Sequence, residues 1–148
     1  MKRLLLASLL FGIFAVSAEA ETPKSSTVLY VQSAHAGSYD GTYLTLKAVP
    51  NTVYFTDRPE RKAGHISNHE FARSWDGDGD TFRTNPPNAD LSILGEPVKN
   101  IVLILEERPR LERRGLRYKV TIIEGEIPAR FGTASLFIDS TVSPQITD

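Results

Sequence analysis

The chain of 148 residues carries 17 basic and 18 acidic side chains, so its formal net charge at pH 7 is −1. This near-neutral balance provides no basic surface for nucleic acid and no strong attraction to an anionic membrane. Cysteine is absent, which excludes disulfides, thiolate metal sites, a cysteine nucleophile and a thiol for lipid attachment.

The N-terminal residues have the three-part layout of a secretory signal peptide. A basic pair at positions 2–3 precedes an uncharged apolar run over residues 4–16, which is too short to span a bilayer as a helix. Small side chains follow at Ala18 and Ala20, the positions before a cleavage site. We therefore predict a signal peptide over residues 1–20.

The remaining part, residues 21–148, has the usual size of one domain and is predicted to form a single β-rich domain. The mature chain is expected to begin at Glu21, with cleavage after Ala18 as the alternative. No second apolar stretch of spanning length follows, so we expect no membrane insertion after cleavage. A disulfide-free secreted domain is typical of the bacterial periplasm or medium.

Three strands are predicted in the first part of the mature chain. Apolar and polar side chains alternate over residues 27–33 and 42–49, and residues 53–55 form a third β-rich segment. Turn-forming residues at 37–41 and 50–51 separate the three segments. The pattern predicts that these strands form an antiparallel meander.

One short helix is predicted in the middle of the chain. Ser67 can cap the helix while Glu70, three residues later, reaches back to the cap amide; Ile66 and Phe71 occupy the positions of a hydrophobic staple. Phe71 and Trp75 are four residues apart and share one face. Because so short a helix is not stable alone, we expect this face to dock on the sheet.

The second half of the chain returns to a strand pattern. Strands are predicted over residues 91–94, 98–105, 116–123 and 134–138, with a charged hairpin loop at 108–115. The near-continuous apolar run at 98–105 predicts a strand covered on both faces. Together, roughly seven strands and one inserted helix predict a mainly β domain, an antiparallel β-sandwich or open barrel.

The central stretch also carries a distinctive pattern of aromatic, charged and proline residues. It comprises residues 55–61 (FTDRPER), Gly64, Phe71, Trp75 and residues 85–91 (NPPNADL), with a similar ending at residues 136–139 (LFID). This pattern resembles a family of small secreted bacterial proteins of unknown function. The resemblance implies no activity, and it implies that the acidic run after Trp75 is not a shared feature.

That acidic run is a candidate calcium site. Asp76, Asp78 and Asp80 alternate as the first three ligands of an EF-hand loop do. However, Thr81 stands where the loop needs glycine, and Pro87 stands where it needs a bidentate glutamate. These two mismatches favour the alternative, a solvated turn after the helix.

The histidines are a second candidate metal site. His65 and His69 are four apart, the spacing that places two imidazoles on one helix face for zinc or copper. A helix that begins at Ser67 leaves His65 outside it, so the two imidazoles are expected to diverge. His35 lies at the end of a different strand, and exposed or locally hydrogen-bonded histidines are the favoured interpretation.

A charged segment between the third strand and the helix is a candidate anion site. Arg58 and Arg61 could form a fork for a carboxylate or phosphate, with Asp57 orienting one guanidinium. The alternative, which we favour, has Asp57 accepting from turn amides and the arginines pairing with Glu60 or Glu70.

Trp75 is the last candidate, either as a ligand platform or, as its shared face with Phe71 favours, as a core residue. The ligand site predicted from sequence therefore comprises Asp57, Arg58, Arg61, His65 and Trp75, and the metal site Asp76, Asp78 and Asp80.

No catalytic motif is present: the sequence has no Gly-x-Ser-x-Gly elbow, no phosphate-binding glycine loop and no His-Glu-x-x-His helix. We therefore predict a noncatalytic binding or structural domain, periplasmic or secreted, whose partner is a small molecule or a protein. The first alternative is a calcium- or transition-metal-binding protein, and the second is a hydrolase with scattered carboxylates. We predict no cofactor, with calcium as the alternative.

Overall fold

The computed structural model describes residues 27–140, which form eleven strands and one short α-helix that continues into a 3₁₀ turn. The elements are β1 (Val28–Ala34), β2 (Ala36–Tyr39), β3 (Tyr43–Lys47), β4 (Thr52–Thr56), β5 (Ala63–Ile66), α1 (Asn68–Ala72), η1 (Arg73–Trp75), β6 (Asn88–Ile93), β7 (Lys99–Leu105), β8 (Arg110–Glu112), β9 (Gly115–Glu124), β10 (Arg130–Phe131) and β11 (Ala134–Ser140). The predicted signal peptide lies outside the described residues. No helix within residues 27–140 is long and apolar enough to cross a membrane.

The mainly β class, the antiparallel pairing and the single inserted helix are confirmed, but the number of strands is eleven rather than about seven. The additional strands are short and lie in segments rich in turn-forming or charged residues. Thus β2 (Ala36–Tyr39) overlaps the predicted turn at 37–41, and β8 lies inside the predicted hairpin loop at 108–115. These residues are extended because distant strands pair with them, which local propensity does not reveal.

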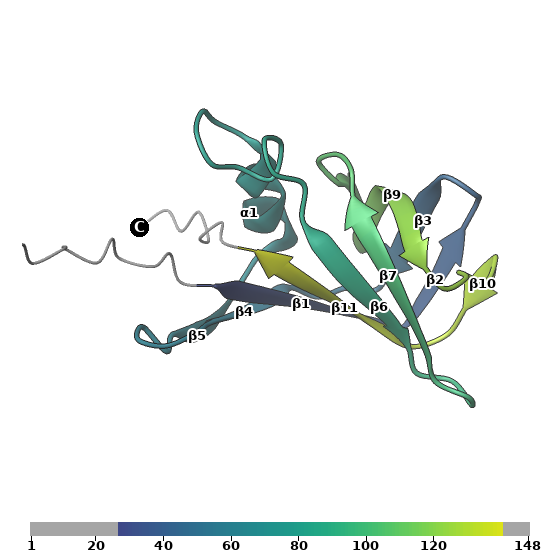
Figure 1. Ribbon diagram of the computed structural model, residues 1–148. Helices are drawn as coiled ribbons and strands as arrows, with labels where there is room; N and C mark the ends of the chain where they lie inside the picture. Colours follow the sequence, from purple (N-terminus) through teal and green to yellow (C-terminus); the bar gives the residue numbers. More distant parts are fainter. Residues whose placement is uncertain (1–26, 141–148) are drawn as a thin grey trace, which may run out of the picture.

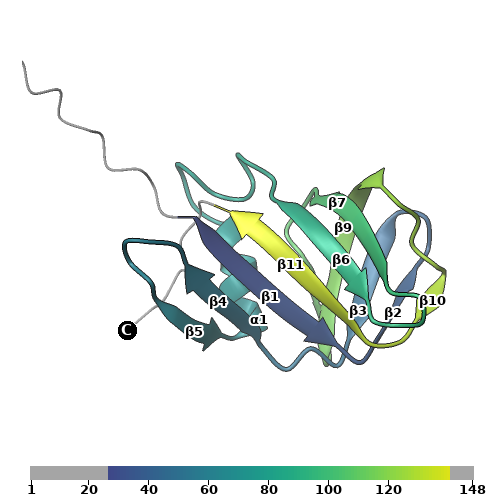
Figure 2. The ribbon, with the colours of Figure 1, turned by 60° about the horizontal axis from the view of Figure 1, so that its bottom comes forward.

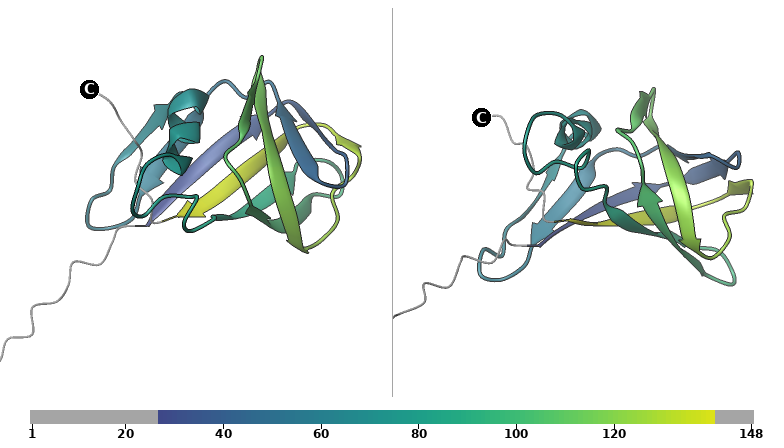
Figure 3. Two further views of the ribbon diagram at one scale, coloured as in Figure 1. Left: turned by 90° about the horizontal axis from the view of Figure 1, so that it is seen from above. Right: turned by 45° about the horizontal axis from the view of Figure 1, so that its top comes forward.

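All strands belong to one antiparallel sheet with the order β10-β2-β3-β9-β7-β6-β11-β1-β4-β5, and β8 pairs with β9. A single residue, His35, separates β1 from β2, yet β1 pairs with β11 and β4 whereas β2 pairs with β10 and β3. The bent β1–β2 segment therefore belongs to both halves of the sheet and curls it into an open barrel (Figure 1). Figure 3 shows α1 on the concave side of this curl.

The predicted meander of the first three strands is wrong. Strand β1 pairs with β4, but β3 pairs with β2 and β9 and not with either of them. The bend at His35 turns the chain away from β1 before the next hairpin forms. Turn signals fix where a strand ends but not which strand it pairs with.

The core fills the concave side of the sheet. Alternate residues of the strands point into it, as predicted for the strand at 116–123, where Leu116, Tyr118 and Val120 are buried and Ile122 is half-buried. The largest fully buried side chains are Tyr30, Tyr118, Phe71, Phe82, Leu44, Leu46, Leu91, Ile101, Leu103, Leu105, Leu116 and Leu136.

The opposite, convex face of the sheet is not covered. Strand β7 was expected to be buried on both faces, but Val102 is 38% exposed and the prediction is wrong for its outer side. Figure 2 shows β5, β4, β1, β11, β6 and β7 side by side on this face, with α1 behind them.

The helix begins as its sequence predicts. The Glu70 backbone N–H donates to the Ser67 hydroxyl at 3.1 Å, and the Ser67 backbone N–H donates to a Glu70 carboxylate oxygen at 2.7 Å. The Ser67 hydroxyl also donates to the Glu70 carboxylate at 2.7 Å, and this bond, together with the one from the Ser67 backbone N–H, holds the pKa of Glu70 below its usual range. The capping box therefore fixes the direction in which α1 leaves β5.

We expect Ser67→Ala to lower the free energy of unfolding by about 0.5–2 kcal/mol, because one cap acceptor is lost. Urea denaturation followed by the fluorescence of Trp75, the single tryptophan, measures this change. Asp78→Ala is a matched control, because Asp78 is exposed and such substitutions usually change stability by less than about 0.5 kcal/mol. Equal midpoints for the two variants would contradict the cap.

Candidate functional site

A cavity of about 680 Å³ opens where the β1–β2 bend, the β3–β4 turn, α1 and the β8–β9 hairpin meet. Four separate segments contribute to it, and none of them forms a site alone. Its lining residues are His35, Ala48, Val49, Pro50, Asn68, His69, Leu111, Glu112, Arg113, Arg114 and Gly115.

Backbone hydrogen bonds hold the segments of this cavity together. The His35 N–H donates to the Lys47 carbonyl at 3.1 Å, and the Val49 N–H donates to the Arg114 carbonyl at 3.0 Å. Between them, Ala48 has a φ of +55°, in the left-handed region that non-glycine residues rarely adopt. Backbone strain of this kind is concentrated at functional sites in proteins.

A close approach of two strands forms the floor of the cavity beside the hairpin. Gly115 pairs with Lys47 of β3 and also with Glu112 of β8. A Cβ atom at Gly115 would overlap the carbonyl oxygen of Leu46, so only glycine fits there without moving the backbone.

A chain of buried polar groups connects the core to the cavity wall. The Tyr118 hydroxyl donates to the Gln32 side-chain carbonyl at 2.6 Å, and the Gln32 amide donates to the Thr52 hydroxyl at 3.0 Å. The Thr52 hydroxyl then donates to the Asn68 Oδ1 atom at 3.1 Å, and Asn68 Nδ2 donates to the Val49 carbonyl at 2.9 Å. Burial raises the pKa of Tyr118, which keeps its hydroxyl a neutral donor. This chain fixes Asn68 on the cavity wall.

The cavity gathers more cationic and donor groups than carboxylates. His35, His69, Arg113 and Arg114 line it together with one carboxylate, Glu112. Within residues 27–140, the side chains of Arg113 and Arg114 make no hydrogen bond or ion pair. Two guanidinium groups at the cavity are therefore available to a ligand.

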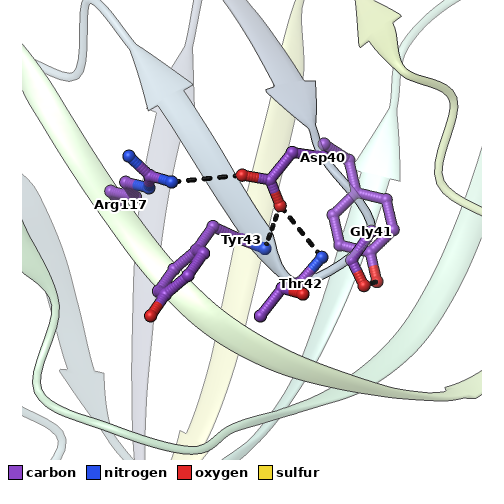
Figure 4. A network of polar contacts seen from close by, with 6 residues as sticks. Asp40, Gly41, Thr42, Tyr43 and Arg117 are labelled. Carbon is purple, nitrogen blue, oxygen red and sulfur yellow. Dashed lines mark hydrogen bonds and ion pairs between the residues drawn. The ribbon is translucent and has the colours of Figure 1, made fainter.

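Arg117 of the same hairpin is already engaged. Arg117 donates to a carboxylate oxygen of Asp40 at 3.1 Å and lies over the Tyr43 ring, whose centroid is 4.4 Å away (Figure 4). The backbone N–H groups of Tyr43 and Thr42 also donate to Asp40, and these bonds, with Arg117, hold the pKa of Asp40 below its usual range. This network stabilises the β2–β3 turn.

The structure places the three predicted residues of the anion fork in the loop between β4 and β5, away from this cavity. The Arg58 N–H donates to the Asp57 carboxylate at 2.6 Å, and the Arg61 N–H donates to the Asp57 carbonyl at 3.1 Å. All three side chains are exposed.

His65 and Trp75, the other two predicted ligand residues, lie apart from that loop and from each other. His65 is exposed on β5, on the convex side of the sheet. Trp75 is only 3% exposed and packs in the core, with ring centroids 4.6 Å from Phe82 and 5.5 Å from Phe71. The five residues therefore do not line one cavity.

The predicted calcium ligands lie on an exposed turn. Asp76 accepts from Arg108 at 2.7 Å, while Asp78 and Asp80 are exposed. Gly77 and Gly79 both have a φ of +91°, which lets the chain turn sharply after η1. Among the described residues, no group of three histidine, aspartate or glutamate side chains could hold a metal ion.

No local pattern in the sequence indicates that His35 and His69 line one cavity, nor that the β8–β9 turn contributes to it. The spacing of four residues points to His65 with His69, but the structure brings His35 and His69 to one cavity and places His65 elsewhere. Arg113 and Arg114 are consecutive residues of the predicted hairpin loop. The concentration of charge in that loop is the one signal in the sequence that points to them. No family model, curated protein or solved structure matches the chain.

Proposed function

We propose that this protein is a noncatalytic binding domain of the periplasm or medium that holds a small anionic ligand in the cavity between α1 and the β8–β9 hairpin. The observation that carries the proposal is the pair of unengaged guanidinium groups, Arg113 and Arg114, beside His35 and His69. A guanidinium offers two parallel N–H donors that match a carboxylate or phosphate.

The balance of charge supports an anion rather than a cation. Glu112 is the one carboxylate of the lining, against the two guanidinium groups of Arg113 and Arg114. The amide of Asn68 is held in place by the buried polar chain and adds a neutral group that can orient a ligand. Apolar side chains from Val49, Pro50 and Leu111 complete the wall, as in most small-molecule sites.

The chemistry of the lining supports binding rather than covalent catalysis. Its residues include no serine, threonine, tyrosine or cysteine, so no hydroxyl or thiol nucleophile faces the ligand. Glu112 and the two histidines could exchange protons, but nothing in the lining pairs with them as an activated nucleophile.

The proposal is tested by NMR of the three histidine side chains while citrate or inorganic phosphate is added. We expect the imidazole signals of His35 and His69 to shift and saturate, while those of His65, on the opposite side of the sheet, stay in place. Glycerol, a neutral polyol, should shift none of them. Binding should weaken as the salt concentration rises, because the attraction is electrostatic.

The double variant Arg113→Gln/Arg114→Gln is expected to weaken binding at least about tenfold, because each charged hydrogen bond contributes about 1.5–3 kcal/mol. Arg130→Gln is the matched control, because Arg130 is an exposed arginine on β10 that does not line the cavity. The proposal is wrong if neither anion shifts His35 and His69 at concentrations of about 1 mM. Equal binding by the double variant and the control would contradict it as well.

A further inference from the structure

A second surface, independent of the cavity, lies on the convex side of the sheet. Its apolar face consists of Leu29 and Val31 of β1, Val53 and Phe55 of β4, and Phe137 of β11. Val53, Phe55 and Phe137 are 43%, 46% and 37% exposed, and no helix or strand of residues 27–140 packs over them (Figure 2). Contiguous apolar surface of this kind marks a site of association.

The strand register arranges this face in a row that crosses six strands. In order from β5 to β7, the row is His65, Val53, Val31, Phe137, Asp90 and Val102. Val31 of β1 is at its middle. The imidazole of His65 lies two strands away from β1, on β5. The carboxylate of Asp90 lies two strands away from β1 in the other direction, on β6. Partial burial between its apolar neighbours raises the pKa of Asp90 above its usual range.

We propose that two copies of this chain associate through their apolar faces, about a twofold axis that runs along β1. Such an axis places Val31 opposite Val31, Val53 opposite Phe137, and His65 of each copy opposite Asp90 of the other. An imidazole N–H and a carboxylate oxygen are complementary in hydrogen bonding. The face is therefore self-complementary, which a twofold dimer requires.

The shape of the sheet agrees with this arrangement. Rotating a twisted sheet by 180° about one of its own strands reproduces the same twist, so the twists of the two copies match. Because both faces are convex, the contact between the copies is closest along β1. The five strands from β5 to β6 span about 19 Å, and a strand of ordinary length about 18 Å. This area is small beside the roughly 800 Å² that each partner contributes to a standard interface, so we expect a weak, concentration-dependent dimer.

Sedimentation equilibrium of the purified protein tests the proposal. The apparent mass should rise with concentration toward twice the monomer mass. Phe137→Lys should weaken the association at least about tenfold, because a charge would be buried beside the centre of the face. Val98→Lys is the matched control, because Val98 is 56% exposed but lies at the β6–β7 turn, off the face. Val53→Lys is used if Phe137→Lys fails to fold by circular dichroism.

An exchange of the polar pair tests the twofold arrangement itself. His65→Asp should weaken the dimer, because two carboxylates then face each other, whereas His65→Asp combined with Asp90→His should restore it. Only a second copy of the same chain predicts this rescue.

Three results would overturn the proposal. The first is a monomer at every concentration up to about 1 mM. The second is a dimer that Phe137→Lys and Val53→Lys leave intact, because it would use another surface. The third is a monomer whose melting temperature falls when residues 141–148 are deleted, because the face would then be covered by the chain's own C-terminal segment. None of these results bears on anion binding at the cavity, which lies on the other side of the sheet.

Discussion

Replacing Trp75 with alanine is expected to lower the free energy of unfolding by about 3–5 kcal/mol. The indole lies in a cluster of four aromatic rings, with Tyr30, Phe71 and Phe82, whose neighbouring ring centroids are 4.6–6.0 Å apart. Its removal would leave a cavity between η1 and the sheet that the surrounding rings cannot fill without moving. A loss of this size is a large part of the total stability of an ordinary domain.

The indole N–H of Trp75 is buried and has no hydrogen-bond partner among the described residues. Trp75→Phe removes this unsatisfied donor and keeps most of the ring, so it should cost much less than Trp75→Ala. Leu94→Ala serves as the control, because Leu94 is 53% exposed and its loss should change stability by less than about 0.5 kcal/mol. Thermal and urea denaturation followed by circular dichroism give all three values. A loss below about 1 kcal/mol for Trp75→Ala would contradict the docking of the helix.

The parts of the fold that could be predicted are those whose physics is local. The capping box joins Ser67 to Glu70, three residues away, and the alternation in β9 repeats every second residue, so both are visible in a short window of sequence. The pairing of β1 with β11 joins the two ends of the described chain, and no short window contains it. Local sequence does not determine how β1, β3 and β4 pair, and the predicted meander of these strands is wrong.

The apolar run of β7 shows a second limit of such reasoning. A strand with apolar residues on both faces is predicted to be buried on both faces. Hydropathy alone does not distinguish a side chain in the core from one on an exposed surface that binds a partner. In the structure, Leu103 points into the core and Val102 lies on the convex side. The apparent excess of apolar residues is consistent with a face that a partner covers.

The candidate site could not be predicted for a similar reason. His35, Asn68, Arg113 and Arg114 come from the β1–β2 bend, the helix and the hairpin turn, and none of them belongs to a motif. The segment that looked most like an anion fork is a turn in which Asp57 accepts from backbone N–H groups, as the favoured interpretation held for that residue. These four residues come together only because the sheet curls, and the curl follows from pairing between strands that are far apart in the sequence.

The close approach of β3 to β9 should make Gly115 one of the least replaceable residues of the chain. We expect Gly115→Ala to lower the free energy of unfolding by about 3 kcal/mol or more, at or above the upper end of the usual cost of overpacking. The added methyl group would overlap the carbonyl of Leu46, which is backbone and cannot rotate away as a side chain would. Strand β3 would have to move away from β9, and the hydrogen bond from the Val49 N–H to the Arg114 carbonyl would lengthen or break.

The matched control is Gly132→Ala, because no heavy atom lies within 4 Å of a Cβ at Gly132. That substitution should be neutral or slightly stabilising, since alanine reduces the conformational freedom of the unfolded chain. Urea denaturation followed by Trp75 fluorescence compares the two variants, and NMR of His35 and His69 in the folded fraction reports on the cavity. Because the displaced strand leads directly into the β3–β4 turn, Gly115→Ala should also perturb these two imidazole signals, while Gly132→Ala should not. Two variants with the same midpoint and unshifted histidines would mean that β3 and β9 are not in contact at this register, and the floor of the proposed binding cavity would then need another explanation.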